Sequence, residues 1–89
     1  MRVTNLTSNR SGREVANQFE LTDDNGNTFF QSYRSIIAKI DKLGKVTLDP
    51  TYWNYSKTTS KYRSSFLGES TKETQKKIDS GEYTLANLN

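Results

Sequence analysis

The sequence predicts a single α+β domain: a three- to four-stranded antiparallel β-meander with one or two C-terminal helices packed on one face. Short segments of alternating or β-branched character fill the first half of the 89-residue chain, and Gly-containing turns separate them. Two helical segments, each followed by Gly, fill much of the second half. We therefore expect a meander over residues 1–49, a helical region over 50–81 and a tail over 82–89.

The composition predicts a folded domain with a small core. Apolar residues make up 31% of the chain, whereas globular domains reach roughly 45–50% on a count that includes Gly. Disordered chains, however, are usually poor in aromatic and β-branched residues. The one Trp, five Tyr and four Phe of this chain lie in patterned segments.

The first two strands are expected on either side of a turn. Val3–Thr7 is a short strand candidate, and the Asn/Ser/Gly-rich segment Ser8–Gly12 predicts a turn. Val15–Thr22 alternates as a half-buried strand does. Its buried face is expected to hold Val15, Asn17, Phe19 and Leu21, and its other face Ala16, Gln18, Glu20 and Thr22.

Two further hairpin turns complete the predicted meander. Asn-Gly within Asp23–Asn27 suits a type I′ turn, which predicts that Thr28–Tyr33 pairs antiparallel with the strand before it. A helix is conceivable over Ile36–Lys42, but the three Ile residues favour a strand, with Ile36, Ala38 and Ile40 on one face and Ile37 and Lys39 on the other. Asp41–Lys45 then turns into a last strand, Val46–Asp49, which Pro50 ends.

Capping residues delimit the predicted helices. Ser56 or Thr58 caps a helix over about 58–67, and Gly68 is placed to end it in a left-handed conformation. Ser70 and Glu73 form a capping box for a second helix over about 71–79, with Gly81 beyond it. The tail after Gly81 is expected to add an edge strand or to pack as a loop.

Several functional classes lack the residues they need. The chain has no Cys and no His, which excludes disulfides, thiolate metal sites and the commonest general base. No glycine-rich phosphate loop, calcium-loop spacing or activated Ser or Thr nucleophile is present. No long apolar run or signal-peptide core is present either. We expect a cytoplasmic, non-enzymatic protein without metal or cofactor and without membrane association.

Positive charge is concentrated in the middle of the chain. Residues 34–63 hold seven Lys or Arg against two Asp, whereas 1–33 and 64–89 each hold three cations against four acids. The same region contains the aromatic run Tyr52–Leu67, and Tyr, Trp and Arg dominate binding hot spots. Trp53, Phe66 and Leu67 are expected to form core, and a solvated sheet edge would also explain the lysines. The predicted partner-binding residues are Arg34, Lys39, Lys45, Tyr52, Tyr55, Lys57, Lys61 and Arg63.

Residues 29–67 resemble a group of short, largely uncharacterised proteins of bacteriophages, prophages and mobile elements. The resemblance rests on S-Y-R-S-I-I-A within the first part and on W-N-Y-S-K-T-T-S-K-Y-R-S-S-F-L in the second. It carries no known activity or site residue. It implies a bacterial host as the setting, and proteins of this kind often bind and redirect host macromolecules.

The leading hypothesis is a phage-type binding protein that modulates or inhibits a host complex, either defence or nucleic-acid-processing machinery. The alternative is direct nucleic-acid binding through the basic and aromatic middle region, and a second alternative is a small structural or assembly subunit. The oligomeric state stays open. So does the role of the hydroxyl groups: those of Ser56, Thr58 and Thr59 could cap the helix while Tyr33 and Tyr55 bond to backbone, or they could face a partner.

Overall fold

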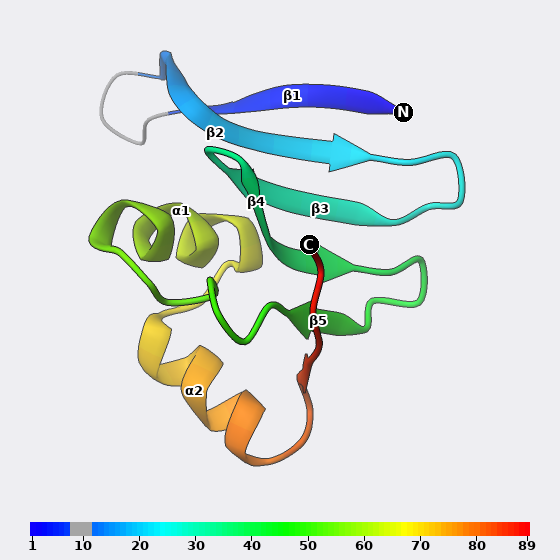
Figure 1. Ribbon diagram of the computed structural model, residues 1–89, viewed down its shortest axis with the longest axis vertical. Coiled ribbons are helices and arrows are strands. Elements are labelled where there is room, and N and C mark those ends of the chain that lie inside the picture. Colours follow the sequence, from blue (N-terminus) through cyan, green and yellow to red (C-terminus); the bar gives the residue numbers. More distant parts are fainter. Residues whose placement is uncertain (8–11) are drawn as a thin grey trace.

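The computed structural model describes residues 1–7 and 12–89 and shows a six-stranded sheet with two helices (Figure 1). The α+β class is as predicted. Most of the predicted turn at 8–12 lies outside the described residues. In chain order the elements are β1 (Arg2–Thr7), β2 (Glu14–Thr22), β3 (Thr28–Ser32), β4 (Ser35–Ile40), β5 (Val46–Leu48), α1 (Lys57–Leu67), α2 (Thr71–Asp79) and β6 (Thr84–Leu85).

The sheet is larger than predicted and is mixed rather than antiparallel throughout. Its strand order follows the chain from β1 to β6, and β1 to β5 form the expected antiparallel meander. β6 pairs with β5 in parallel, because α2 carries the chain back before the tail runs alongside β5. The predicted count of three or four strands was therefore too small.

β2 does not keep the alternation that its sequence suggests. Asn17 has a positive φ of 64°, so the side chains change sides at this point. Gln18 is fully buried, whereas Phe19 and Leu21 are only partly buried. Leu21 pairs with Phe29, on the face opposite the buried core. The predicted buried face of this strand was therefore wrong beyond Val15.

A second irregularity lies in β4. The register with β3 shifts between Phe30 and Gln31, opposite Ile37. A bulge inserts one extra residue, so neighbouring side chains can share a face. Ile37 and Ala38 are accordingly both fully buried, although the prediction placed them on opposite faces.

The core lies between one face of the sheet and α1. Phe30 of β3 stacks on Phe66 of α1, with ring centroids 5.8 Å apart. Trp53 and Leu67 pack against this core as expected, and Tyr62 lies within it. The buried apolar residues are Phe30, Ile37, Ala38, Val46, Leu48, Tyr62 and Tyr83.

The caps predicted from the sequence are present. The Ser56 side chain accepts a bond from the Thr59 N–H, so α1 begins one residue earlier than expected, and Gly68 ends it with a φ of 70°. Ser70 and Glu73 form the predicted capping box of α2. Local hydrogen bonding thus determines both helix starts.

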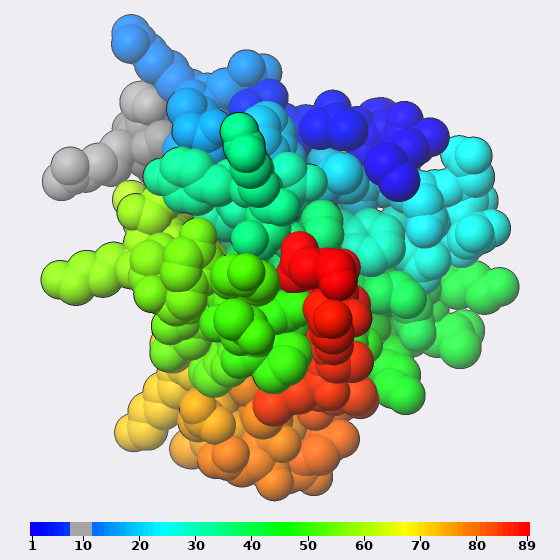
Figure 2. Space-filling view, viewed as in Figure 1, coloured from blue at the N-terminus to red at the C-terminus, as the bar shows by residue number. Residues whose placement is uncertain are grey.

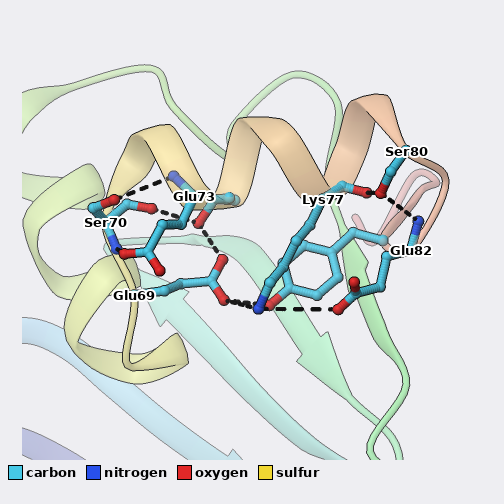
Figure 3. Close-up of polar contacts among 8 residues, drawn as sticks. Glu69, Ser70, Glu73, Lys77, Ser80 and Glu82 are labelled. Carbon is cyan, nitrogen blue, oxygen red and sulfur yellow. Dashed lines mark hydrogen bonds and ion pairs between the residues drawn. The ribbon is translucent and has the colours of Figure 1, made fainter.

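α2 contributes little apolar surface and is held by a polar network (Figure 3). The buried Glu69 carboxylate accepts hydrogen bonds from the Thr74 hydroxyl at 2.6 Å, the Lys77 ammonium at 2.8 Å and the Tyr83 hydroxyl at 2.6 Å. Burial tends to raise the pKa of Glu69, but these three donors together keep it below its usual value. One carboxylate thereby joins the α1–α2 connection, α2 and the residue that precedes β6.

Candidate partner-binding surface

The topology brings part of the predicted binding set to one end of the sheet. The β3–β4 turn lies at the end nearest α1, away from the β2–β3 and β4–β5 turns (Figure 1). β5 also ends on this side, and the segment after it leads into α1, whose first turn is joined to β3 by the hydroxyls of Ser32 and Thr59. In Figure 2 the residues around the turn, the segment before α1 and α1 itself meet on the face in view. We name the exposed members the basic–aromatic surface: Tyr33, Arg34, Tyr55, Lys57 and Lys61.

The β3–β4 turn displays a tyrosine in a strained conformation. Tyr33 and Arg34 form a two-residue turn, and Tyr33 has a φ of 57°. Positive φ is a genuine outlier for a bulky side chain and is usually left to Gly or Asn. Tyr33 is nevertheless 49% exposed and contributes nothing to the core. Strain of this kind persists where the surroundings enforce it, and such positions cluster at functional sites.

Three contacts enforce the geometry of this turn. The Tyr33 N–H donates to the Asn17 carbonyl at 2.7 Å, and the Gln31 side chain donates to the Tyr33 carbonyl at 2.8 Å. Behind the turn, the buried hydroxyls of Ser32 and Thr59 lie 2.9 Å apart, which ties β3 to the first turn of α1. The tip is therefore rigid in its backbone while its side chains face outward.

A second tyrosine is displayed by the segment before α1. Tyr55 is 49% exposed, and its ring stands edge-on to that of Tyr52 at 5.5 Å. Tyr52 is half-buried against the core, so it positions Tyr55 rather than standing free itself. The side-chain hydroxyls of Tyr33 and Tyr55 form no hydrogen bond within the described residues. The alternative in which both hydroxyls bond to backbone is therefore not what the structure shows.

Asp49 fixes the start of this segment. Its buried carboxylate accepts from the Thr51 and Tyr52 N–H groups at 2.9 and 3.1 Å, and from the Leu88 N–H and the Asn89 side chain, both at 3.0 Å. Burial by itself raises the pKa of Asp49, but the four donors outweigh it and lower the pKa below its usual value. The carboxylate thus holds the aromatic segment and the C-terminal residues together.

The cations of the basic–aromatic surface form no ion pair with any described carboxylate. Arg34, Lys57 and Lys61 are exposed, and none forms an ion pair among residues 1–7 and 12–89. Lys61 lies over the Tyr62 ring, with its nitrogen 5.4 Å from the ring centroid. These charges are therefore available to an anionic group of a partner.

Arg63 is not part of this surface, contrary to the prediction. It is fully buried. Its guanidinium donates to the Trp53 carbonyl and the Thr71 hydroxyl, both at 2.6 Å, and to Asn54 and Ser64 at 3.3 Å. The guanidinium also lies 5.1 Å from the Trp53 ring. The guanidinium donors thus connect the segment before α1 to the start of α2, so Arg63 has a structural role.

Lys39 and Lys45 lie apart from the basic–aromatic surface. Lys39 is on the open face of the sheet, with its nitrogen 6.0 Å from the Phe29 ring centroid. Lys45 is in the β4–β5 turn, at the far end of β4, where its N–H donates to the Asp41 carboxylate. The sequence reasoning grouped these residues by charge alone, and the antiparallel topology separates them.

Sequence reasoning did not select Tyr33 as a binding residue. The predicted strand Thr28–Tyr33 included Tyr33, and the turn that the structure shows contains neither Asn nor Gly to mark it in the sequence.

Two further features concern the described residues as a whole, at this surface and elsewhere. Across the residues that the structure describes, no cluster of three or more potential metal-ligating side chains is found. Nor does any described helix have the length and apolar character to span a membrane. The basic–aromatic surface itself presents two exposed phenol groups and three cations that form no ion pair within the described residues.

Comparison with protein families gives one match. A family model described as a family of unknown function, DUF8033, matches residues 1–82. The chain belongs to this family. The match spans the whole basic–aromatic surface of this DUF8033 protein and stops before Tyr83. No curated protein and no solved structure matches the chain.

Proposed function

We propose that this DUF8033 protein is a non-enzymatic binding protein whose basic–aromatic surface engages a host macromolecular complex. The observation that carries the proposal is the strained, exposed Tyr33 beside Arg34. Tyr and Arg are the residues that most often anchor protein interfaces. The rigid turn also lowers the entropy that a partner must offset on binding. A phage-type protein that redirects host machinery would need a surface of this kind.

A comparative pull-down from bacterial lysate, read by mass spectrometry, tests the proposal. The baits are the natural chain, the double variant Tyr33→Asn/Arg34→Ala, and Lys45→Ala as a matched control that removes an exposed cation at the opposite end of the sheet. We expect the same host proteins with the natural chain and the control, and their loss with the double variant. Equal recovery by all three baits would refute the assignment of this surface.

Nucleic-acid binding is the second candidate. It is favoured by two exposed Tyr rings and by three cations that form no ion pair within the described residues. Single-strand binders combine stacking aromatics with a basic track for phosphates. Binding that neutralises several phosphates weakens steeply with salt. A gel shift with single- and double-stranded DNA at two salt concentrations separates the candidates: a shift confined to low salt and lost in Tyr33→Asn/Arg34→Ala supports nucleic acid, and no shift at low salt excludes it.

A further inference from the structure

β1 is an edge strand with an open outer side. The sheet begins with β1, whose pairing is with β2 alone. Within residues 1–7 and 12–89, no group hydrogen-bonds to the backbone of β1 from the side away from β2. An edge strand presents a row of unpaired N–H and C=O groups that another strand can pair with.

The opposite edge of the sheet is the two-residue strand β6 (Thr84–Leu85). β6 pairs with β5, and the Ala86 N–H donates to the Leu48 carbonyl at 3.0 Å. Beyond the end of β5, the Asn89 side chain accepts from the Ile36 N–H at 2.8 Å and donates to the Ile36 carbonyl at 3.0 Å. The Asn89 amide thereby occupies the place of an opposing strand residue on β4. Very short edge strands such as β6 give little for another chain to pair with, so β1 is the long edge strand among the described strands.

The composition of β1 favours pairing. Natural edge strands are often protected by Lys, Pro or inward-pointing charges. β1 reads R-V-T-N-L-T and has no Lys, Pro or acid, while its β-branched residues suit a strand. Its one charged side chain, Arg2, stands at its start, so antiparallel pairing of two copies would place the two Arg2 residues at opposite ends. The exposed Val3, at 58%, begins an apolar row on the open face that continues through Leu21 and Phe29.

We propose that β1 is a self-association edge, on which β1 of a second copy pairs antiparallel about a two-fold axis near Thr4. The pairing would continue the sheet across both chains and bring the two apolar rows beside one another. Because the two-fold pairing uses the same edge of both chains, the assembly closes as a dimer rather than growing into a filament. The contact involves six residues from each chain, so the dimer should be weak and depend on concentration.

Cysteine cross-linking tests the geometry, since the chain has no Cys of its own. Cα atoms of facing residues in an antiparallel pair lie about 4.5–5.5 Å apart, within the range that a disulfide spans. We expect Thr4→Cys to form a disulfide-linked dimer at least about 10-fold faster than Thr84→Cys, a difference of about 1.4 kcal/mol in barrier. Thr84 is a matched control because it is an exposed Thr on the two-residue strand β6, at the opposite edge of the sheet.

Sedimentation of the untagged chain provides the second measurement. We expect a monomer–dimer equilibrium with a Kd below about 1 mM, weakened at least about 10-fold by Thr4→Lys and unchanged by Thr84→Lys. Circular dichroism establishes that each variant is folded; if Thr4→Lys unfolds, the cross-linking comparison decides. A natural chain that stays monomeric at about 1 mM, or equal cross-linking of the two Cys variants, would overturn the proposal.

Discussion

The backbone N–H of Tyr33 donates a 2.7 Å hydrogen bond to the carbonyl of Asn17, and both residues have positive φ, 57° and 64°. The bond joins the irregularity in β2 to the exposed turn between β3 and β4. The change of side at Asn17, which buries Gln18, and the display of Tyr33 are therefore two parts of one local arrangement. A non-Gly residue in this conformation costs of order 1–3 kcal/mol.

Replacing Tyr33 by Asn should stabilise the protein while weakening partner binding. Asn adopts positive φ more readily than Tyr, and the exposed ring gives up no core contact. We expect the free energy of unfolding to rise by about 0.5–1 kcal/mol, measured by urea denaturation. Tyr55→Asn is the control, because Tyr55 is equally exposed at 49% but has no positive φ. Stabilisation by both variants, or by neither, would argue against strain at Tyr33.

Features governed by neighbouring residues could be predicted from the sequence. The bounds of α2, its capping box and the left-handed Gly68 all depend on residues within one helical turn. The hairpin at Asp23–Asn27 is similarly local: the Asp23 carboxylate bonds the N–H groups of Asn25 and Asn27, both at 2.9 Å. Such contacts are made between residues close in the sequence, so the local sequence pattern was enough to predict them.

Features governed by distant residues escaped prediction. The positive φ at Asn17 accompanies a hydrogen bond from Tyr33, which lies sixteen residues further along the chain. β6 likewise forms only because the chain returns to β5. The burial of Arg63 did leave a signal. It lies four residues after Thr59 and three before Phe66, on the same helical face as the core. The prediction placed Arg63 at the surface because Arg is usually exposed, and it gave this spacing less weight.

Asp49→Asn should destabilise the fold strongly at neutral pH and less at low pH. The amide nitrogen would face the Leu88 N–H or the Thr51 N–H instead of accepting from it. We expect a loss of about 2–4 kcal/mol at pH 7. The pKa of Asp49 is lowered in the folded protein from 3.8. Its contribution is therefore complete above about pH 4 and is lost as the pH falls through the folded value.

Urea denaturation at several pH values measures this effect, with Asp24→Asn as the control. The Asp24 side chain is 96% exposed, so its replacement should leave stability nearly unchanged. The difference in free energy of unfolding between the natural chain and Asp49→Asn should become smaller as the pH is lowered. If that difference were constant from pH 7 to about pH 2, the charge of the Asp49 carboxylate would not be what stabilises the segment before α1.

Glu69→Gln should lower the pKa of Tyr83 as well as the stability of the α2 region. Burial, together with the hydrogen bond to the Glu69 carboxylate and its negative charge, raises the pKa of Tyr83 from 10.0 to about 12. Without that charge the phenolate forms more easily, so the pKa should fall toward 10.0. We expect a stability loss of about 1–3 kcal/mol at pH 7. Tyrosine-selective NMR titration and urea denaturation measure the two effects.

Glu73→Gln provides the matched control for this network. Glu73 belongs to the capping box of α2 and bonds Ser70 rather than Tyr83. Its replacement should leave the Tyr83 titration where it is. Because the folded pKa of Tyr83 is raised, the stability it contributes is complete below about pH 10 and is lost as the pH rises toward 12. Tyr83 titrating at the same pH in both variants would contradict the role given to Glu69.

Arg63→Lys should destabilise the protein even though it preserves the charge. The guanidinium reaches the Trp53 carbonyl and the Thr71 hydroxyl at once, from two nitrogens, and a single ammonium cannot reproduce that fork. Because the site is fully buried, an unmatched donor or acceptor has no access to water. We expect a loss of about 2–4 kcal/mol in the free energy of unfolding. Arg34→Lys is the control, since Arg34 is exposed and should change stability by less than about 0.5 kcal/mol. If Arg63→Lys were as stable as the natural chain but lost partner binding, Arg63 would have a binding role rather than the structural role that its burial indicates.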